Sequence, residues 1–95
     1  MPESHNMKMT HSSASMSNSS ATVLAANTNR RYVLLQNIGG VDVWCNFSAT
    51  AVANTGFRLD ANGGIFEMNS SNIYMGIITG ITGSGTTTVL VTEGQ

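Results

Sequence analysis

The chain has 95 residues, of which 41% are hydrophobic and only 9% are charged, and its formal net charge at pH 7 is −1. This length fits one small domain, and the charged fraction is well below the roughly 25% that is typical of soluble domains. The sequence therefore lacks the basic stripe that nucleic-acid binding requires, and it lacks the run of roughly 18 apolar residues that a membrane-spanning helix requires.

Residues 1–20, MPESHNMKMTHSSASMSNSS, are predicted to form an extended arm. The segment shows no hydrophobic period and has too few apolar side chains to build a core, so another protein surface is expected to hold it. Met7, Met9 and Met16 are adaptable apolar side chains that suit docking in a groove of a neighbouring protein. The arm is therefore expected to bind a partner.

An alternative use of the arm is binding of Cu(I). His5, Met7, Met9 and His11 occupy every second position, and an extended chain would place all four on one side. Thioether and imidazole groups are suitable ligands for this soft ion. Because nothing else in the sequence points to metal handling, partner contact is the favoured interpretation, and no metal or other cofactor is predicted.

From about Ala21 the sequence changes to short β-branched and aromatic runs that are separated by Gly and Asn, with no helical stripe. This pattern predicts an all-β body over residues 21–95, either a small antiparallel β-sandwich or a jelly-roll-like barrel. About seven short strands are predicted, at residues 21–25, 31–38, 41–47, 56–60, 64–69, 73–79 and 86–93.

A Gly-Gly pair, Gly39 and Gly40, separates the second and third of these strands. It predicts a tight hairpin, because glycine tolerates the positive φ angles that two-residue turns need. Alternation along the strand after the pair places Trp44 on its outward face. The apolar side chains on the other face of that strand are Val41, Val43, Cys45 and Phe47.

Two more turns are predicted, at Asn62-Gly63-Gly64 and over residues 80–85. The segment 73–77, with its alternating Ile and Met, is expected to be well buried. The last strand, 86–93, fits either a sheet edge or a strand that is buried against a neighbouring subunit. Asp60 and Glu67 flank the second turn, and we interpret them as solubility charges rather than calcium ligands, because no EF-hand pattern accompanies them.

The sequence offers no recognisable set of catalytic residues. Both histidines, His5 and His11, lie in the predicted arm, so the body has carboxylates but no imidazole base. Cys45 is the only cysteine, which excludes an internal disulfide and a zinc cluster, and it has no histidine in the body to activate it. The chain is predicted not to be an enzyme, and Cys45 is predicted to be a buried small hydrophobic residue.

The body contains several candidates for contact with a partner. Arg30 and Arg31 start a long predicted strand, where they fit either an acidic patch on a partner or a solvated strand end. Trp44, Tyr32 and Tyr74 fit either a sugar-stacking platform or anchors in the core or in a subunit interface, and interface use is the commoner role of these residue types.

Three stretches of the body carry a resemblance to a known group of proteins. VLAANTNRRYVLLQNI at residues 23–38 is followed by VDVWCNF at 41–47 and by SGTTTVLVTEG at 84–94. Over about residues 21–95 these stretches resemble small β-sandwich proteins of tailed bacteriophages. Members of that broad group are virion components that decorate or cement capsids, form head fibres, or sit at the neck and tail. The resemblance implies a binding role without catalytic residues, and it does not extend to the arm.

The expected function is therefore that of a capsid decoration or cement protein, which binds the outside of the major capsid shell and stabilises the head. The alternative is a neck, tail or head-fibre protein that attaches the virion or recognises a host-surface glycan. The expected partners are the major capsid protein or other virion proteins, in a homo-oligomer for which a trimer is favoured. Because the N-terminus lacks a secretory signal, synthesis in the host cytoplasm and residence on the capsid surface are expected. The expected partner-binding residues are Met7, Met9, Met16, Arg30, Arg31 and Trp44.

Overall fold

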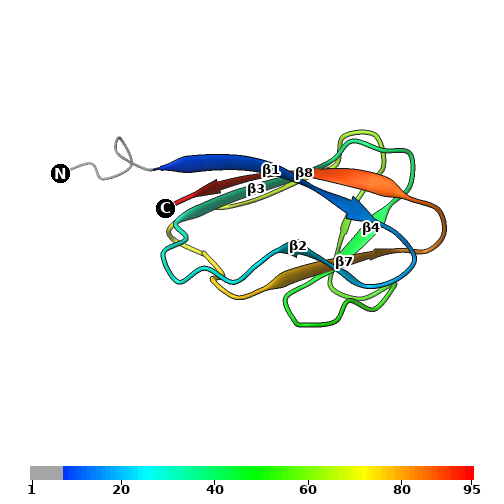
Figure 1. Cartoon of the computed structure of the whole chain (residues 1–95), viewed down its shortest axis with the longest axis horizontal. Coiled ribbons are helices and arrows are strands. Elements are labelled where there is room, and N and C mark those ends of the chain that lie inside the picture. Colours follow the sequence, from blue (N-terminus) through cyan, green and yellow to red (C-terminus); the bar gives the residue numbers. More distant parts are fainter. Residues whose placement is uncertain (1–7) are drawn as a thin grey trace.

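The computed structural model describes residues 8–95, and this part of the chain is all β, with no helix. Antiparallel strands form two four-stranded sheets that face each other (Figure 1), in the orders β1-β8-β3-β6 and β2-β7-β4-β5. The predicted fold class, a small antiparallel β-sandwich, is confirmed. The strands are β1 (Met9–Met16), β2 (Ala21–Leu24), β3 (Tyr32–Asn37), β4 (Val43–Asn46), β5 (Phe57–Leu59), β6 (Ile65–Met68), β7 (Ile78–Thr82) and β8 (Thr87–Gly94).

The core lies between the two sheets and follows from the two-residue period of the strands. In β3, Val33 and Leu35 are fully buried, whereas Leu34 between them faces outward. In β4 of the opposite sheet, Val43 and Cys45 are fully buried, as the sequence predicted, and Trp44 lies on the outer face. The buried cluster consists of Met16, Val23, Val33, Leu35, Val43, Cys45, Leu59, Met68, Ile78, Val89 and Val91.

The predicted hairpin between β3 and β4 is wrong, because these strands belong to different sheets. Buried Asn37 organises the crossing: its Nδ2 donates to the carbonyls of Val41, at 2.7 Å, and Leu59, at 3.0 Å. Its Oδ1 accepts from the Gly39 amide and the Thr87 hydroxyl. Gly39 is needed here because a Cβ would overlap the Thr87 side chain. The Gly-Gly pair thus marks a turn, but the turn leads to the other sheet.

The structure also corrects the strand assignment in the C-terminal part of the chain. The strand predicted at 73–79 lies instead at Ile78–Thr82, and Met75 in the preceding loop is 43% exposed. β8 is not an edge strand, because it lies between β1 and β3 within one sheet; the alternative, burial of one face against a neighbouring subunit, stays a prediction. Gly80 allows the close packing of β7, since a Cβ there would meet the Met16 sulfur at 2.7 Å.

The segment that was predicted to be an arm supplies an integral strand. β1 pairs with β8 without interruption from Met9 opposite Gly94 to Met16 opposite Thr87. Met16 is 1% exposed and belongs to the core. The prediction that residues 1–20 contain nothing that builds a core is therefore wrong from Met9 to Met16, whereas residues 1–7 lie outside the described part. β1 exists because β8 provides a complete row of main-chain partners, which no sequence pattern within β1 shows.

Candidate binding surfaces

The outer face of the β1-β8-β3-β6 sheet is broad and nearly free of charge. Its β8 row consists of Thr88, Leu90 and Thr92, and Leu90 at its centre is 41% exposed. At the two sides of the sheet, Met9 is 43% and Ile65 is 60% exposed. We call this surface the first-sheet face. Its outward residues are Met9, His11, Ser13, Ser15, Thr88, Leu90, Thr92, Tyr32, Leu34, Gln36, Ile65 and Glu67.

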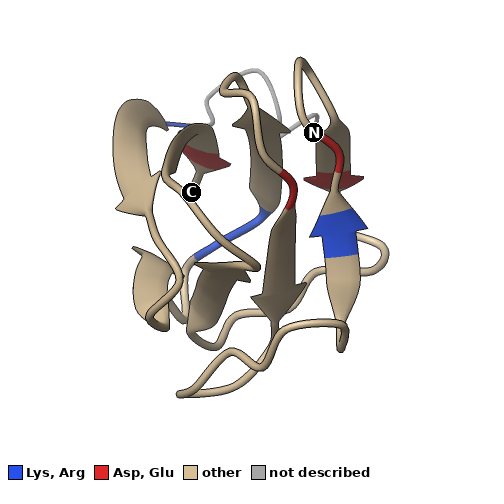
Figure 2. Ribbon diagram, turned by 90° about the vertical axis from the view of Figure 1, so that its right-hand side faces the viewer, with Lys and Arg blue, Asp and Glu red and all other residues tan. Residues whose placement is uncertain are grey.

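Glu67 is the single charged side chain among those outward residues, and it accepts a hydrogen bond from Tyr32 on the neighbouring strand. The Tyr32 hydroxyl donates to Glu67 Oε2 at 2.6 Å. This hydrogen bond, with smaller effects of burial and of the Glu67 charge, raises the pKa of Tyr32. In Figure 2 most of the ribbon is tan, and Lys, Arg, Asp and Glu residues occupy only short coloured segments. The first-sheet face therefore offers neutral polar groups and exposed aliphatic side chains rather than an electrostatic pattern.

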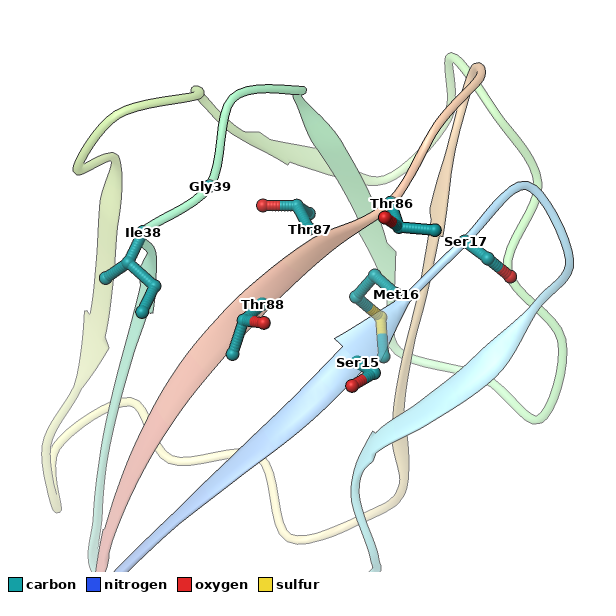
Figure 3. Close-up of a pocket in the computed structure, with 8 residues that line it drawn as sticks. All are labelled: Ser15, Met16, Ser17, Ile38, Gly39, Thr86, Thr87 and Thr88. Carbon is teal, nitrogen blue, oxygen red and sulfur yellow. The ribbon is translucent and has the colours of Figure 1, made fainter.

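A hydroxyl-rich groove of about 590 Å³ borders one end of this face (Figure 3). The end of β1, the start of β8 and the turn after β3 form its walls. Ile38, which is 49% exposed, lies at its rim. The groove extends the neutral character of the first-sheet face to the sheet end. Its lining residues are Ser15, Met16, Ser17, Ile38, Gly39, Thr86, Thr87 and Thr88.

Arg30, which was predicted to contact a partner, is instead buried inside the chain with its side chain 0% exposed. Its Nε donates to Glu93 Oε2 at 2.8 Å, and the Glu93 side chain is 13% exposed. Its other nitrogens donate to the carbonyls of Tyr74, Gly76 and Ala25, at 2.7, 3.0 and 2.6 Å. Arg30 thus joins β8 to two loops, and this buried side chain has no surface to offer to a partner.

Arg31 remains accessible, and it lines a groove of about 680 Å³ together with Lys8 and the C-terminal Gln95. Ile73 and Met75 supply apolar surface in the same groove. Within residues 8–95, Arg30 and Arg58 are held in ion pairs, whereas Lys8 and Arg31 are not. Of the two adjacent arginines, Arg31 is therefore the one that could meet an acidic partner.

Trp44 lies beside a shallow hollow of about 300 Å³ on the other sheet, lined also by Asp42 and Ser84. Its indole ring lies so close to Gly83 that a Cβ there would be 3.4 Å from the ring. Tyr32 lies on the first-sheet face, and Tyr74 belongs to a different aromatic group. The suggested platform of the three aromatic residues is therefore wrong, and Trp44 is the only one of them at this hollow.

Tyr74 belongs to an aromatic group that closes one side of the sandwich. Phe57 of β5 and Phe66 of β6 stack with their ring centroids 4.1 Å apart, and these strands are edges of the two sheets. Phe47 contacts Tyr74 with a centroid distance of 4.7 Å. Phe47 was predicted to face the core, but it is 43% exposed. This group joins the sheets by offset and tilted ring contacts.

The suggested copper arrangement is only partly within the described residues, since His5 and Met7 are outside them. Met9 and His11 occupy alternate outward positions of β1, and His11 Nδ1 lies 3.0 Å from the Thr92 hydroxyl. From Lys8 onward, the structure brings together no group of three His, Cys, Asp or Glu side chains that could hold a metal ion. The described residues also contain no helix that is long and apolar enough to cross a membrane.

Cys45 is a free, buried cysteine, and burial raises its pKa to about 12. A thiol in the unfolded chain loses its proton near pH 8.5, so rising pH favours unfolding between about pH 9 and 12. We expect the natural chain to lose about 1–2 kcal/mol of unfolding free energy, relative to Cys45→Ala, between about pH 8 and 10. Urea denaturation of both proteins at each pH measures this difference. If the difference in unfolding free energy between the natural chain and Cys45→Ala stays constant with pH, the pKa of Cys45 is not raised in the folded protein.

Comparisons with known proteins give no relative for this chain. No protein-family model, no curated protein and no solved structure matches it. The candidate surfaces therefore stand on geometry alone: the first-sheet face, the groove with Lys8 and Arg31, and the hollow beside Trp44. The sequence did not delimit the first-sheet face, but the alternation of Thr88, Leu90 and Thr92 in β8 had raised one alternative that points to it, a strand buried against a neighbouring subunit.

Proposed function

We propose that the chain is a structural virion protein, a capsid decoration or cement protein that binds the outside of the major capsid shell. The resemblance of residues 21–95 to small phage β-sandwich proteins suggests this role. The observation that supports it best is the nearly uncharged first-sheet face. Charged residues are depleted at the centres of protein interfaces, and methionine and aromatic residues are enriched there. A face with Met9, Leu90 and Ile65 exposed among Thr and Ser suits a protein partner better than open solvent.

The structure changes the expected mode of attachment. Because residues 9–16 are part of the sandwich, they bind a shell as one row of the first-sheet face rather than as a separate tether. Many copies on a symmetric lattice would each make a modest contact, and the sum would stabilise the head. Met16 and Arg30 take no part in this contact because both are buried. Met9, Arg31 and Trp44 remain accessible.

Binding to undecorated heads tests this proposal. Purified chain is mixed with expanded, empty heads of the phage that encodes it, and the heads are sedimented. We expect the chain to sediment with heads and Leu90→Asp to lower the bound fraction at least about tenfold, because it buries an unpaired charge in the interface. Thr22→Asp is the matched control, since Thr22 is exposed on the opposite sheet. Equal binding of both variants, or no binding of the natural chain, would refute the proposal.

The hollow beside Trp44 favours a second candidate, recognition of a host-surface glycan by a neck, tail or fibre protein. An indole ring offers a flat apolar face to a sugar ring, and the Asp42 carboxylate in the same hollow can accept hydrogen bonds from sugar hydroxyls. A glycan array distinguishes the candidates. Specific sugar binding that is lost in Trp44→Ala and kept in Leu90→Asp would favour glycan recognition over capsid binding.

A further inference from the structure

We propose that β1 pairs with β1 of a second copy of this chain, antiparallel and about a two-fold axis. The two β1-β8-β3-β6 sheets then form one continuous sheet across the dimer. The inference rests on the free edge of β1 and does not depend on the proposed capsid role. It adds an interaction surface that is separate from the first-sheet face, because an edge binds through main-chain groups.

The hydrogen bonds between β1 and β8 show which main-chain groups remain free. Lys8 and Gln95 donate to each other's carbonyls, at 2.7 and 2.9 Å, so they form a hydrogen-bonded pair. In an antiparallel ladder, hydrogen-bonded pairs alternate with pairs that are not hydrogen-bonded. Because Lys8 is in a hydrogen-bonded pair, the even-numbered residues of β1 are the ones that bond to β8. The odd-numbered residues direct their N–H and C=O groups to the open side. Within residues 8–95, no hydrogen bond reaches the open side of Met9, His11, Ser13 or Ser15.

The other three sheet edges carry features that discourage pairing, and β1 does not. β5 has only three residues, and the exposed Arg58–Asp60 ion pair lies along it. β2 has four residues and a register shift between Thr22 and Leu24. β6 has four residues and carries Glu67. Short length, bulges and charges are the usual protections of an edge strand.

β1, by contrast, is eight residues long, has continuous register, and contains no charge and no proline. A long, regular and neutral edge is a ready template for another strand. β1 is therefore the edge on which strand addition is expected.

A second β1 fits this edge in one favoured register. Pairing Met9 with Ser15 and His11 with Ser13 of the other copy gives every free N–H and C=O group a partner. It also keeps outward side chains on the same face, as antiparallel pairing requires. A shift by two residues would leave either Met9 or Ser15 without a partner in the other β1, depending on its direction. A shift by one residue would place inward residues opposite outward ones.

The geometry points to a second copy and to closure at two chains. Because β1 is uncharged from Met9 to Met16, two copies approach without like-charge repulsion. A two-fold axis places the same patch on both sides, so the contact is isologous and complete with two chains. Each chain has one such edge, so this contact forms a dimer and not the trimer that was expected from the sequence.

Ser13→Pro tests the proposal without disturbing the sandwich. The Ser13 N–H points to the open edge, so proline removes a donor from the dimer contact but none from the ladder with β8. Ser13→Ala is the matched control, since it keeps the N–H group. Ser13→Lys is a second disrupting variant, because it adds a charge to the edge and leaves the backbone unchanged.

Light scattering over a range of concentrations gives the molar mass, and amide hydrogen exchange gives the site. We expect the natural chain and Ser13→Ala to reach twice the 10.0 kDa of one chain, and Ser13→Pro and Ser13→Lys to remain monomeric. In the dimer, exchange at Met9, His11 and Ser15 should slow by about tenfold or more relative to Ser13→Lys. A monomer at all concentrations, a trimer, or an oligomer in which these amides exchange fast would overturn the proposal.

Discussion

Replacing Arg30 with methionine is expected to lower the free energy of unfolding by about 3–5 kcal/mol, the usual effect of breaking a buried ion pair. Methionine fills much of the same volume, but it leaves the mostly buried Glu93 carboxylate without its cation. It also leaves the carbonyls of Tyr74, Gly76 and Ala25 without their donor. For a domain of this length the total stability is roughly 5–14 kcal/mol, so this one change would remove a large share of it.

Arg31→Met is the matched control, because it makes the same chemical change at the neighbouring residue. Arg31 lines an open groove, and surface substitutions of this kind are usually within about 0.5 kcal/mol of the natural protein. Urea denaturation followed by tryptophan fluorescence measures both variants. If Arg30→Met and Arg31→Met have the same urea midpoint, the buried ion pair and hydrogen bonds of Arg30 do not stabilise the fold.

A double-mutant cycle separates the ion pair from the carbonyl contacts. Once Arg30→Met is present, Glu93→Gln removes the unpaired charge and is expected to restore part of the lost stability, with a coupling of about 0.5–3 kcal/mol. The carbonyl contacts of Arg30 stay lost in the double variant, so it should not return to the natural stability. Additive effects of the two substitutions would show that Glu93 is not energetically linked to Arg30.

The fold class could be predicted from sequence because burial in strands has a period of two. Val33 and Leu35 in β3, and Val43 and Cys45 in β4, follow this period, and all four are fully buried. The order of strands could not be predicted. The Gly39-Gly40 pair marks a turn, but the crossing to the other sheet depends on Asn37 and its bonds to distant residues.

The contrast between Arg30 and Arg31 could not be predicted either. The two residues are adjacent and chemically identical, and the partner that distinguishes them, Glu93, lies 63 residues away. The strand predicted at 73–79 failed for a related reason. Its aliphatic residues suggested burial, whereas the true β7 contains Gly80, which is buried because Met16 and Val23 fill the space beside it. In each case a long-range contact decided the outcome.

Removing residues 1–16 is expected to unfold the protein or leave it prone to aggregation, although the sequence predicted these residues to be an arm outside the β body. The deletion removes β1, exposes the β8 edge, and takes Met16 out of the core. Loss of a buried methionine side chain alone costs about 2–5 kcal/mol, and the unpaired β8 main chain adds to this loss. Circular dichroism and thermal melting of the truncated chain measure the effect.

Two point variants identify the cause if the truncated chain cannot be purified. Met16→Ala should lower the free energy of unfolding by about 2–5 kcal/mol, because Met16 is 1% exposed and leaves a cavity. Met9→Ala, in the same strand but 43% exposed, should change it by less than about 0.5 kcal/mol. Equal effects of the two variants, or a truncated chain that melts like the full one, would show that β1 is not part of the folded sandwich. The same two substitutions can be made in Ser13→Lys, which is expected to be monomeric. If Met16→Ala still lowers the free energy of unfolding more than Met9→Ala does, β1 stabilises its own chain without a second copy.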